Sequence, residues 1–177
     1  MGIIFFFLLR PRNGVINELL ILIGVLSEPT DFLATRVSSL LSLVSVGVWA
    51  NFGFSMVLLL AGLQTIPKDV YESAAIDGAN ALQSFRYITV PLIAPILKIV
   101  LMLSIVFALR SFDIVKTLTD GRPAGTTHVM FTYMFGLFFG VDRAPRIGYA
   151  SALAVTATVL IGVVSYFYFQ TTKREPY

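Results

Sequence analysis

Residues 71–91 read YESAAIDGANALQSFRYITVP, a polar and small-residue island between two long apolar segments. Pro67 stands just before the island and suits a helix start, because the N–H group that proline lacks has no partner in a first helical turn. Glu72 follows near the positive end of the helix dipole. Gly78 permits a left-handed residue at the helix end. This pattern predicts a short helix over residues 69–79 that another backbone can approach closely.

The second half of the island carries an apolar stripe. Leu82, Phe85 and Ile88 recur at helical spacing. We expect this stripe to pack under the membrane-embedded part of the chain. Pro91 is expected to end the helix that carries it.

Three apolar segments are long enough to cross a membrane, which takes about 20 residues. They are Val37–Leu63, which has no charge, Val90–Leu109, which is interrupted by Pro91, Pro95 and Lys98, and Ile147–Phe169. The whole chain is 56% hydrophobic and 13% charged, whereas about a quarter of the residues of a soluble domain are charged. The sequence therefore predicts an all-α, polytopic membrane protein with about three full transmembrane helices.

Shorter apolar stretches flank these spans. Val129–Val141 is aromatic-rich and too short to cross, so it predicts a re-entrant or interfacial helix that Asp142 and Arg143 end. Ile3–Leu9 is also too short and is interpreted as the end of a longer element. An amphipathic patch at Val15–Leu26 is expected at the membrane interface, residues 117–127 as a turn-rich loop, and residues 171–177 as a polar tail.

The island resembles a loop that defines one family. Residues 72–74 (ESA), Gly78 and, nine residues later, residues 88–91 (ITVP) resemble the coupling loop of permease subunits of bacterial ATP-binding-cassette importers. Ser73 and Val90 depart from the family's alanine and leucine. The fuller pattern over residues 71–79, with Phe85 and Pro95 downstream, is similar to the carbohydrate-uptake branch.

Further matches extend this resemblance from about Gly14 to the C-terminus. They are Gly14–Asn17, Leu60–Pro67, Phe112–Asp113 and Gly148–Ala154. The resemblance implies one importer-permease domain over residues 1–177, with a partial extracytoplasmic segment at 1–36 and the coupling loop at 67–91. Family permeases carry further spans before this region, so we expect the chain to be N-terminally truncated relative to the family.

The resemblance implies a transport subunit in the bacterial cytoplasmic membrane. It would move a sugar or related polar solute by alternating access and would be coupled through the 69–79 helix to a separate ATPase. The implied partners are an ATP-binding-cassette ATPase dimer, a second permease subunit, an extracytoplasmic solute-binding protein and membrane lipid. ATP and Mg²⁺ would be bound by the ATPase.

Residue types in the chain agree with a subunit that is not an enzyme. No lysine follows a glycine, so the Gly-Lys-Ser/Thr phosphate-binding loop is missing and the chain cannot hydrolyse ATP by that route. His128 is the only histidine and there is no cysteine, so neither a histidine-based metal site nor a nucleophile–base pair is expected. A net charge of +3 is too weak to predict nucleic-acid binding.

The ATPase-coupling residues implied by the resemblance are Glu72, Ala74, Ala75, Asp77, Gly78 and Ala79. Helical spacing alone places Tyr71, Ala75 and Gly78 on one flat face, which suits docking of a helix in a groove. Position alone also allows interpretations that need no partner. Glu72 would then be a carboxylate that stabilises the N-terminus of its own helix, and Asp77 a residue that ends its own helix.

Candidates for the transport pathway are Trp49, Asn51, Arg110 and Asp113. Each has an alternative. Trp49 would then be an interfacial or packing aromatic residue. Asn51 would form a hydrogen bond between helices, and Arg110 would form a surface ion pair with Asp113. His128 is interpreted as structural.

The charge distribution does not follow the positive-inside tendency if the coupling loop and the C-terminus are cytoplasmic. That side then carries Lys68, Arg86, Lys98, Lys173 and Arg174, and the other side carries Arg10, Arg12, Arg36, Arg110, Lys116, Arg122, Arg143 and Arg146. The loop is placed in the cytoplasm because its motif is more specific than the charge count. Two alternatives stay open: an importer of glycerol phosphate or another polar solute, which Arg110 or Arg122 in the pathway would favour, and a truncated scaffold without transport.

Overall fold

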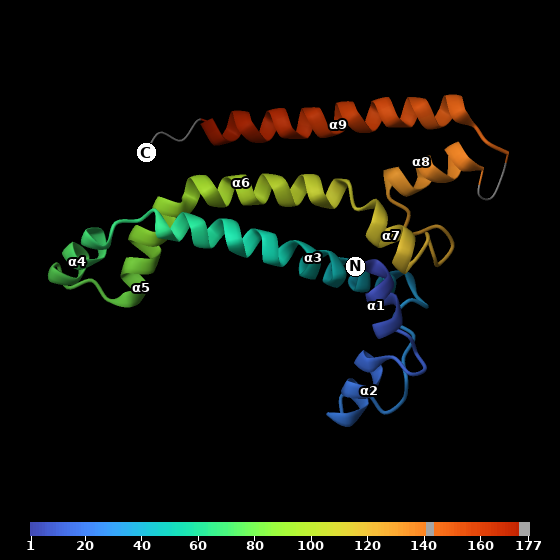
Figure 1. Cartoon of the computed structure of the whole chain (residues 1–177), viewed down its shortest axis with the longest axis horizontal. Helices are drawn as coiled ribbons and strands as arrows, with labels where there is room; N and C mark the ends of the chain where they lie inside the picture. Colours follow the sequence, from blue (N-terminus) through green and yellow to red (C-terminus); the bar gives the residue numbers. More distant parts are fainter. Residues whose placement is uncertain (141–143, 174–177) are drawn as a thin grey trace.

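Three long helices lie side by side and alternate in direction (Figure 1). The computed structural model describes residues 1–140 and 144–173, with side chains as far as Gln170. The long helices are α3 (Arg36–Gln64), α6 (Val90–Leu109) and α9 (Ile147–Lys173), and α6 packs against both of the others. Each contains a stretch long and apolar enough to span a membrane. The predicted all-α polytopic membrane fold is confirmed.

Shorter helices gather at the two ends of this row. At one end lie α4 (Lys68–Ile76) and α5 (Ala81–Ser84), together with the last turns of α9. At the other end lie α1 (Gly2–Leu8), α2 (Val15–Leu22), α7 (Phe112–Leu118) and α8 (Met130–Phe139). α8 matches the short apolar helix predicted at 129–141, and Val141, Asp142 and Arg143 lie outside the described residues.

The helix after the polar loop does not end at Pro91. It continues from α5 through a π-helical turn, η1 (Phe85–Thr89), directly into α6. In that turn the N–H of Val90 donates to the carbonyl of Phe85, five residues back. Because Pro91 cannot donate and its ring crowds the preceding turn, a widened turn just before it lets the helix pass. The prediction of a break at Pro91 was wrong.

The apolar stripe of this segment also differs from expectation. Leu82 is 74% exposed and Phe85 is 56% exposed, and Ile88 is half-buried. α5 and η1 are continuous with α6, and Figure 1 shows them bent away from the line of the long helices at the α4 end of the row. The stripe is therefore an open surface, and the prediction that it packs under the membrane-embedded part was wrong.

Other element ends shift by a few residues. α2 ends at Leu22 rather than near Leu26, and α9 runs to Lys173, so the first residues of the expected tail are helical. Residues 174–177 lie outside the described part. α7 was not predicted, and it takes in the first two residues of the expected loop at 117–127.

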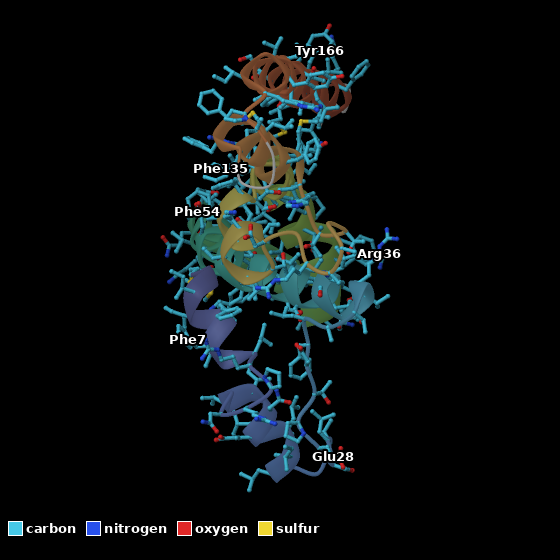
Figure 2. All side chains as sticks on the ribbon, turned by 90° about the vertical axis from the view of Figure 1, so that its right-hand side faces the viewer. Phe7, Glu28, Arg36, Phe54, Phe135 and Tyr166 are labelled. Carbon is cyan, nitrogen blue, oxygen red and sulfur yellow. The ribbon has the colours of Figure 1, made fainter. Side chains whose placement is uncertain are left out.

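The buried core is small and lies where α1, α3 and α7 meet. It consists of Leu9, Val46, Ile114 and Leu118. Elsewhere apolar side chains project outward around the long helices, as Phe54 and Tyr166 do when the row is viewed end-on (Figure 2). Such faces are stable only against lipid or against other membrane helices.

A buried asparagine ties the N-terminal segment together. The amide nitrogen of Asn17 donates to the carbonyls of Arg10 and Thr30, at 2.9 and 3.0 Å. Its oxygen accepts from the N–H of Thr30 at 2.9 Å, and the residue is 1% exposed. Asn17 thus joins the turn before α2 to the segment that leads into α3.

We expect Asn17→Ala to loosen this segment. The substitution removes the partner of three partly buried backbone groups, and each bond is worth about 0.5–1.5 kcal/mol. Trypsin should then cleave the detergent-solubilised protein after Arg12 about tenfold faster. Glu18→Ala, at an exposed neighbouring position, is the matched control. Equal cleavage of the two variants would show that the asparagine does not hold the segment.

Candidate functional site

The helix of the polar loop, α4, has well-defined ends. Pro67 is its N-cap residue, one position before the predicted first turn. At the other end Ala79 N–H donates to the Ala74 carbonyl at 2.9 Å, and Gly78 N–H to the Ala75 carbonyl at 3.1 Å. These two bonds form a Schellman motif, which needs a left-handed residue at Gly78. Its φ of 80° confirms the predicted helix end.

α4 is fastened to the start of the second span. The hydroxyl of Tyr71 lies 2.9 Å from the hydroxyl of Thr89 in η1, and Thr89 is 7% exposed. Between them, Asn80 and Gln83 form a capping box that starts α5, with bonds of 2.8 and 2.9 Å. Tyr71 thus joins α4 directly to the π turn that precedes Pro91.

The six predicted coupling residues divide between the surface and the interior of the loop. Glu72, Ala75, Asp77 and Gly78 are exposed, and Ala79 is half-buried. Ala74 is 8% exposed, because it faces the chain's own loop, as Tyr71 does. The flat face predicted through Tyr71, Ala75 and Gly78 is thus corrected: Ala74 and Tyr71 support the surface from inside and do not form it.

Glu72 is the fifth residue of α4, and only Asp69 is acidic in the first turn. The dipole's effect fades within that first turn, so it gives little reason for a carboxylate at Glu72. In the described part of the chain the Glu72 carboxylate has no hydrogen bond or ion pair. Asp77 is the C-cap residue of α4, which fits the interpretation that it ends its own helix and still leaves its side chain exposed.

Large apolar side chains surround this carboxylate surface. Ile76 is 86% exposed and Tyr87 is 71% exposed. A hollow of about 330 Å³ lies beside Gly78, lined by Asp77, Gly78, Ala79, Gln83, Tyr87 and Ile88. Ile76 and Tyr87 were not predicted to belong to this surface, although a bulky apolar residue at the end of a polar helix was a usable signal. The exposed surface of the loop thus combines carboxylates, large apolar side chains and a hollow.

The four pathway candidates do not gather in one place. Asn51 donates to the hydroxyl of Ser104 at 2.8 Å, which joins α3 to α6. Both residues line a cavity of about 430 Å³ that also includes Ser111 and His128. Trp49 is 64% exposed and does not line this cavity. Asn51 thus combines the two roles that were left open, a bond between helices and a place at a cavity wall.

Arg110 and Asp113 make no ion pair with each other among the residues that the structure describes. α6 ends before Arg110 and α7 begins before Asp113, so the two do not share a helix face. The interpretation as a surface pair was wrong. Arg110 lines a separate cavity of about 480 Å³ that is rich in phenylalanine.

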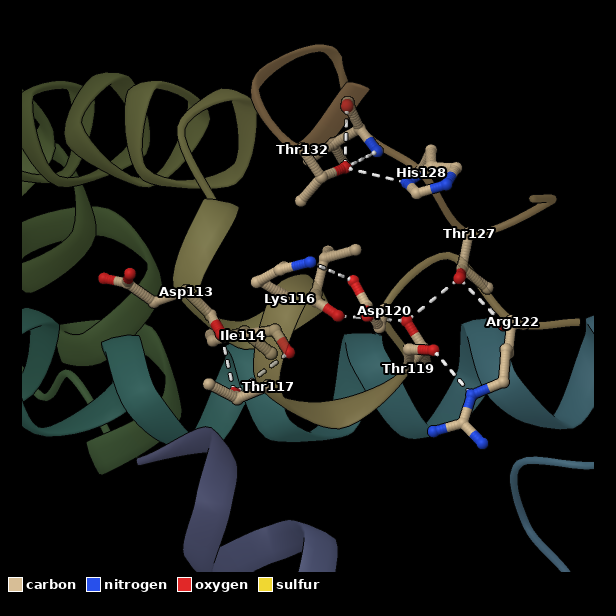
Figure 3. Close-up of polar contacts among 12 residues, drawn as sticks. Asp113, Ile114, Lys116, Thr117, Thr119, Asp120, Arg122, Thr127, His128 and Thr132 are labelled. Carbon is tan, nitrogen blue, oxygen red and sulfur yellow. Dashed lines mark hydrogen bonds and ion pairs between the residues drawn. The ribbon is translucent and has the colours of Figure 1, made fainter. Parts of the chain in front are cut away.

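His128 lies beside Thr132, with Nδ1 3.2 Å from its hydroxyl (Figure 3). Thr132 also caps the start of α8 through the N–H of Val129 at 3.0 Å. The described residues contain no cluster of three histidine or carboxylate side chains that fits a metal ion.

Three long apolar helices and the polar loop that joins α3 to the second long helix are the features of a membrane permease. Residues 1–172 match the family described as the binding-protein-dependent transport system inner membrane component, and the chain belongs to that family. It is 40% identical over 148 residues to the trehalose/maltose transport system permease protein MalF of Thermococcus litoralis, a match that covers 84% of this chain and 48% of that protein. The chain spans about half the length of the curated relatives it matches.

Two solved structures have the same fold over nearly the whole chain. One is a bacterial ABC transporter involved in the import of the acidic polysaccharide alginate, with a TM-score of 0.83 and 27% identity over 98% of this chain and 59% of that one. The other is a bacterial alginate ABC transporter in complex with an alginate pentasaccharide-bound periplasmic protein, with a TM-score of 0.82 and 27% identity, covering 98% and 58%. The predicted family is confirmed, together with sugar-type importer permeases as relatives.

We expect Gly78→Val to unravel the end of α4. A side chain in the left-handed conformation costs about 1–2 kcal/mol, although nothing lies within 4 Å of the added Cβ. Hydrogen exchange at the amide of Ala79 should therefore be about tenfold faster. Gly78→Asn is the matched control, since asparagine tolerates this conformation and should retain most of the protection. Unchanged exchange in the valine variant would contradict the motif's role.

Proposed function

We propose that this chain forms the coupling loop and part of the pathway of an ATP-driven importer permease for a sugar or related polar solute. Residues 1–177 act in this proposal as one permease domain, with the coupling loop at 67–91. The observation that carries it is the Glu72 carboxylate. It is exposed and has no partner among the residues that the structure describes, on a loop that a Tyr71–Thr89 bond fastens to a membrane span.

The loop surface has the chemistry of a helix that docks in a groove. Ala75 and Gly78 present little side-chain bulk, so a partner backbone can come close. Ile76 and Tyr87 offer apolar area to bury, and Glu72 and Asp77 offer hydrogen-bond acceptors. The partner is an ATP-binding-cassette ATPase dimer that binds ATP and Mg²⁺ itself. This chain binds no cofactor and hydrolyses nothing.

Movement would pass from the ATPase into the membrane through α4. Closure of the ATPase dimer displaces α4, the Tyr71–Thr89 bond carries the displacement into η1, and Pro91 and Pro95 let α6 tilt. The cavity between α3 and α6, which Asn51 and Ser104 line, then changes its exposure to the two sides. Such a switch between two packed arrangements is alternating access.

The proposal places α4 and the last turns of α9 on the cytoplasmic side. Both lie at the same end of the helix row in Figure 1. α7, α8 and the N-terminal segment then lie on the outer side, where a second permease subunit and a solute-binding protein complete the importer. One of the solved relatives contains a periplasmic protein of this kind, which supports that partner. The relatives named for trehalose/maltose and for alginate support a carbohydrate as the solute.

Glu72→Ala should uncouple ATP turnover from uptake in proteoliposomes that contain the assembled importer. Loss of a hydrogen bond to a charged group is worth about 1.5–3 kcal/mol, so uptake per ATP should fall at least about tenfold. Glu72→Gln retains the shape of the side chain without its charge, so its uptake per ATP should lie between that of the unchanged chain and that of Glu72→Ala. Asp69→Ala removes a carboxylate from the same helix and serves as control. Coupled uptake at the normal rate in Glu72→Ala would refute the assignment.

A further inference from the structure

A cavity of about 500 Å³ lies at the end of the molecule remote from α4, and arginines dominate its polar lining. Arg10 and Arg12 come from the turn between α1 and α2, and Arg122 comes from the loop after α7. Asp31, just before α3, is the one acidic residue among the lining residues. Three guanidinium groups against one carboxylate leave a surplus of positive charge around a concave site.

These guanidinium groups have no acidic partner. Among the described residues none of them forms an ion pair with Asp31, whose carboxylate accepts from the N–H of Leu33 at 2.9 Å. The guanidinium carbon of Arg10 lies 4.4 Å from the centroid of the Phe7 ring, which holds the group flat. The Nε of Arg122 donates to the carbonyl of Thr119 at 3.3 Å. The other N–H groups of these arginines remain available to an anion.

Buried polar residues fix the backbone at two of the three arginines, Arg10 and Arg122. Asn17 bonds the carbonyl of Arg10 and both backbone groups of Thr30, and so places Arg10 beside Asp31. On the other wall, the hydroxyl of Thr127 lies 2.9 Å from that of Thr119 and 2.8 Å from the carbonyl of Arg122. Figure 3 shows the Arg122 side chain beside Thr119, whose carbonyl accepts from its Nε, with the end of the guanidinium group beyond that bond. A surface cluster of mobile arginines would not have such backing.

The rest of the lining is apolar and includes Phe6, Leu9, Leu33 and Leu118. A sugar ring combines apolar faces with polar edges, and an acidic sugar adds a carboxylate or phosphate that an arginine binds with two parallel hydrogen bonds. The volume is in the range of about 300–1,000 Å³ usual for small-ligand sites. We propose that this cavity binds the anionic group of an acidic saccharide on the outer side of the importer, so that the transported solute is an anionic sugar.

This inference rests on the proposed importer function for the side of the membrane and for the solute. Binding itself needs no ATPase, so it is measured on the purified full chain in nanodiscs of neutral phosphatidylcholine. The probes are digalacturonate, glucose 6-phosphate, neutral maltose and inorganic phosphate, each titrated by calorimetry. Saturable binding of either anionic sugar, stronger than that of maltose and of inorganic phosphate, is the expected result, and the two sugars distinguish a carboxylate from a phosphate ligand.

Variants assign the binding to the cavity. Arg122→Gln and Arg12→Gln should each weaken binding of the anionic sugar by about tenfold or more. Arg36→Gln, which removes an exposed arginine outside the cavity, should leave it unchanged. Asp31→Asn removes the opposing charge and retains the oxygen that accepts from Leu33, so it should tighten binding. A gain of affinity cannot result from misfolding.

Equal binding of maltose or inorganic phosphate would overturn the inference, as would equal losses in the Arg36 and Arg122 variants or no gain with Asp31→Asn. These results are independent of the test at Glu72. If sugar binding fails and Glu72→Ala still uncouples uptake, only the anionic solute is refuted. If the sugar binds and the Glu72 variant transports normally, the coupling role is refuted instead.

Discussion

The structure depends first on the hydrogen-bonding need of the backbone in hydrocarbon. Lipid offers no partner for a peptide N–H or C=O, so each span must satisfy these groups within its own helix. α3, α6 and α9 do so, and irregular backbone is found at the ends of the row. Two features interrupt the regular bonding of the second span: Pro95 within α6, which has no N–H to donate, and the π turn before Pro91, where the bonding pattern shifts by one residue and the chain passes the proline without a break.

That same turn is where the polar loop is attached. Tyr71 reaches from α4 to Thr89, and the π turn is a less regular, more deformable stretch than the helix on either side. A rigid α4 with a Schellman end can therefore act on α6 through one defined contact, while the exposed side of α4 remains open to another protein. Tyr71 and the buried Ala74 thus face the chain's own loop, and Glu72, Ala75 and Ile76 lie on the exposed side of the same short helix.

Much of this could be predicted from single stretches of sequence. Apolar stretches of sufficient length with at most one charge identified the three spans, and the glycine after a polar helix identified its end. The π turn could not be predicted, because Pro91 favours a break and only the packed helix overrides that preference. Ala74 and Ala75 look alike in the sequence, and their opposite exposure comes from how α4 rests on η1. The arginine cavity was also hidden, since Arg10, Asp31 and Arg122 are distant in sequence and meet through the bonds of Asn17 and Thr127. α7 had a weak local signal, an acidic residue in its first turn and a lysine in its last.

The central claim is that the exposed side of α4 contacts an ATPase, and the chain suits a direct test because it contains no cysteine. Ala75→Cys, on α4, and Glu28→Cys, at the far end of the molecule in Figure 2, can each be treated in native membranes with a short thiol-to-amine cross-linker. Mass spectrometry then identifies the joined peptides. The account predicts ATPase peptides joined to the Ala75 variant and none joined to the Glu28 variant. ATPase peptides joined only to the Glu28 variant, or to neither variant in membranes from which the ATPase co-purifies with this chain, would contradict it.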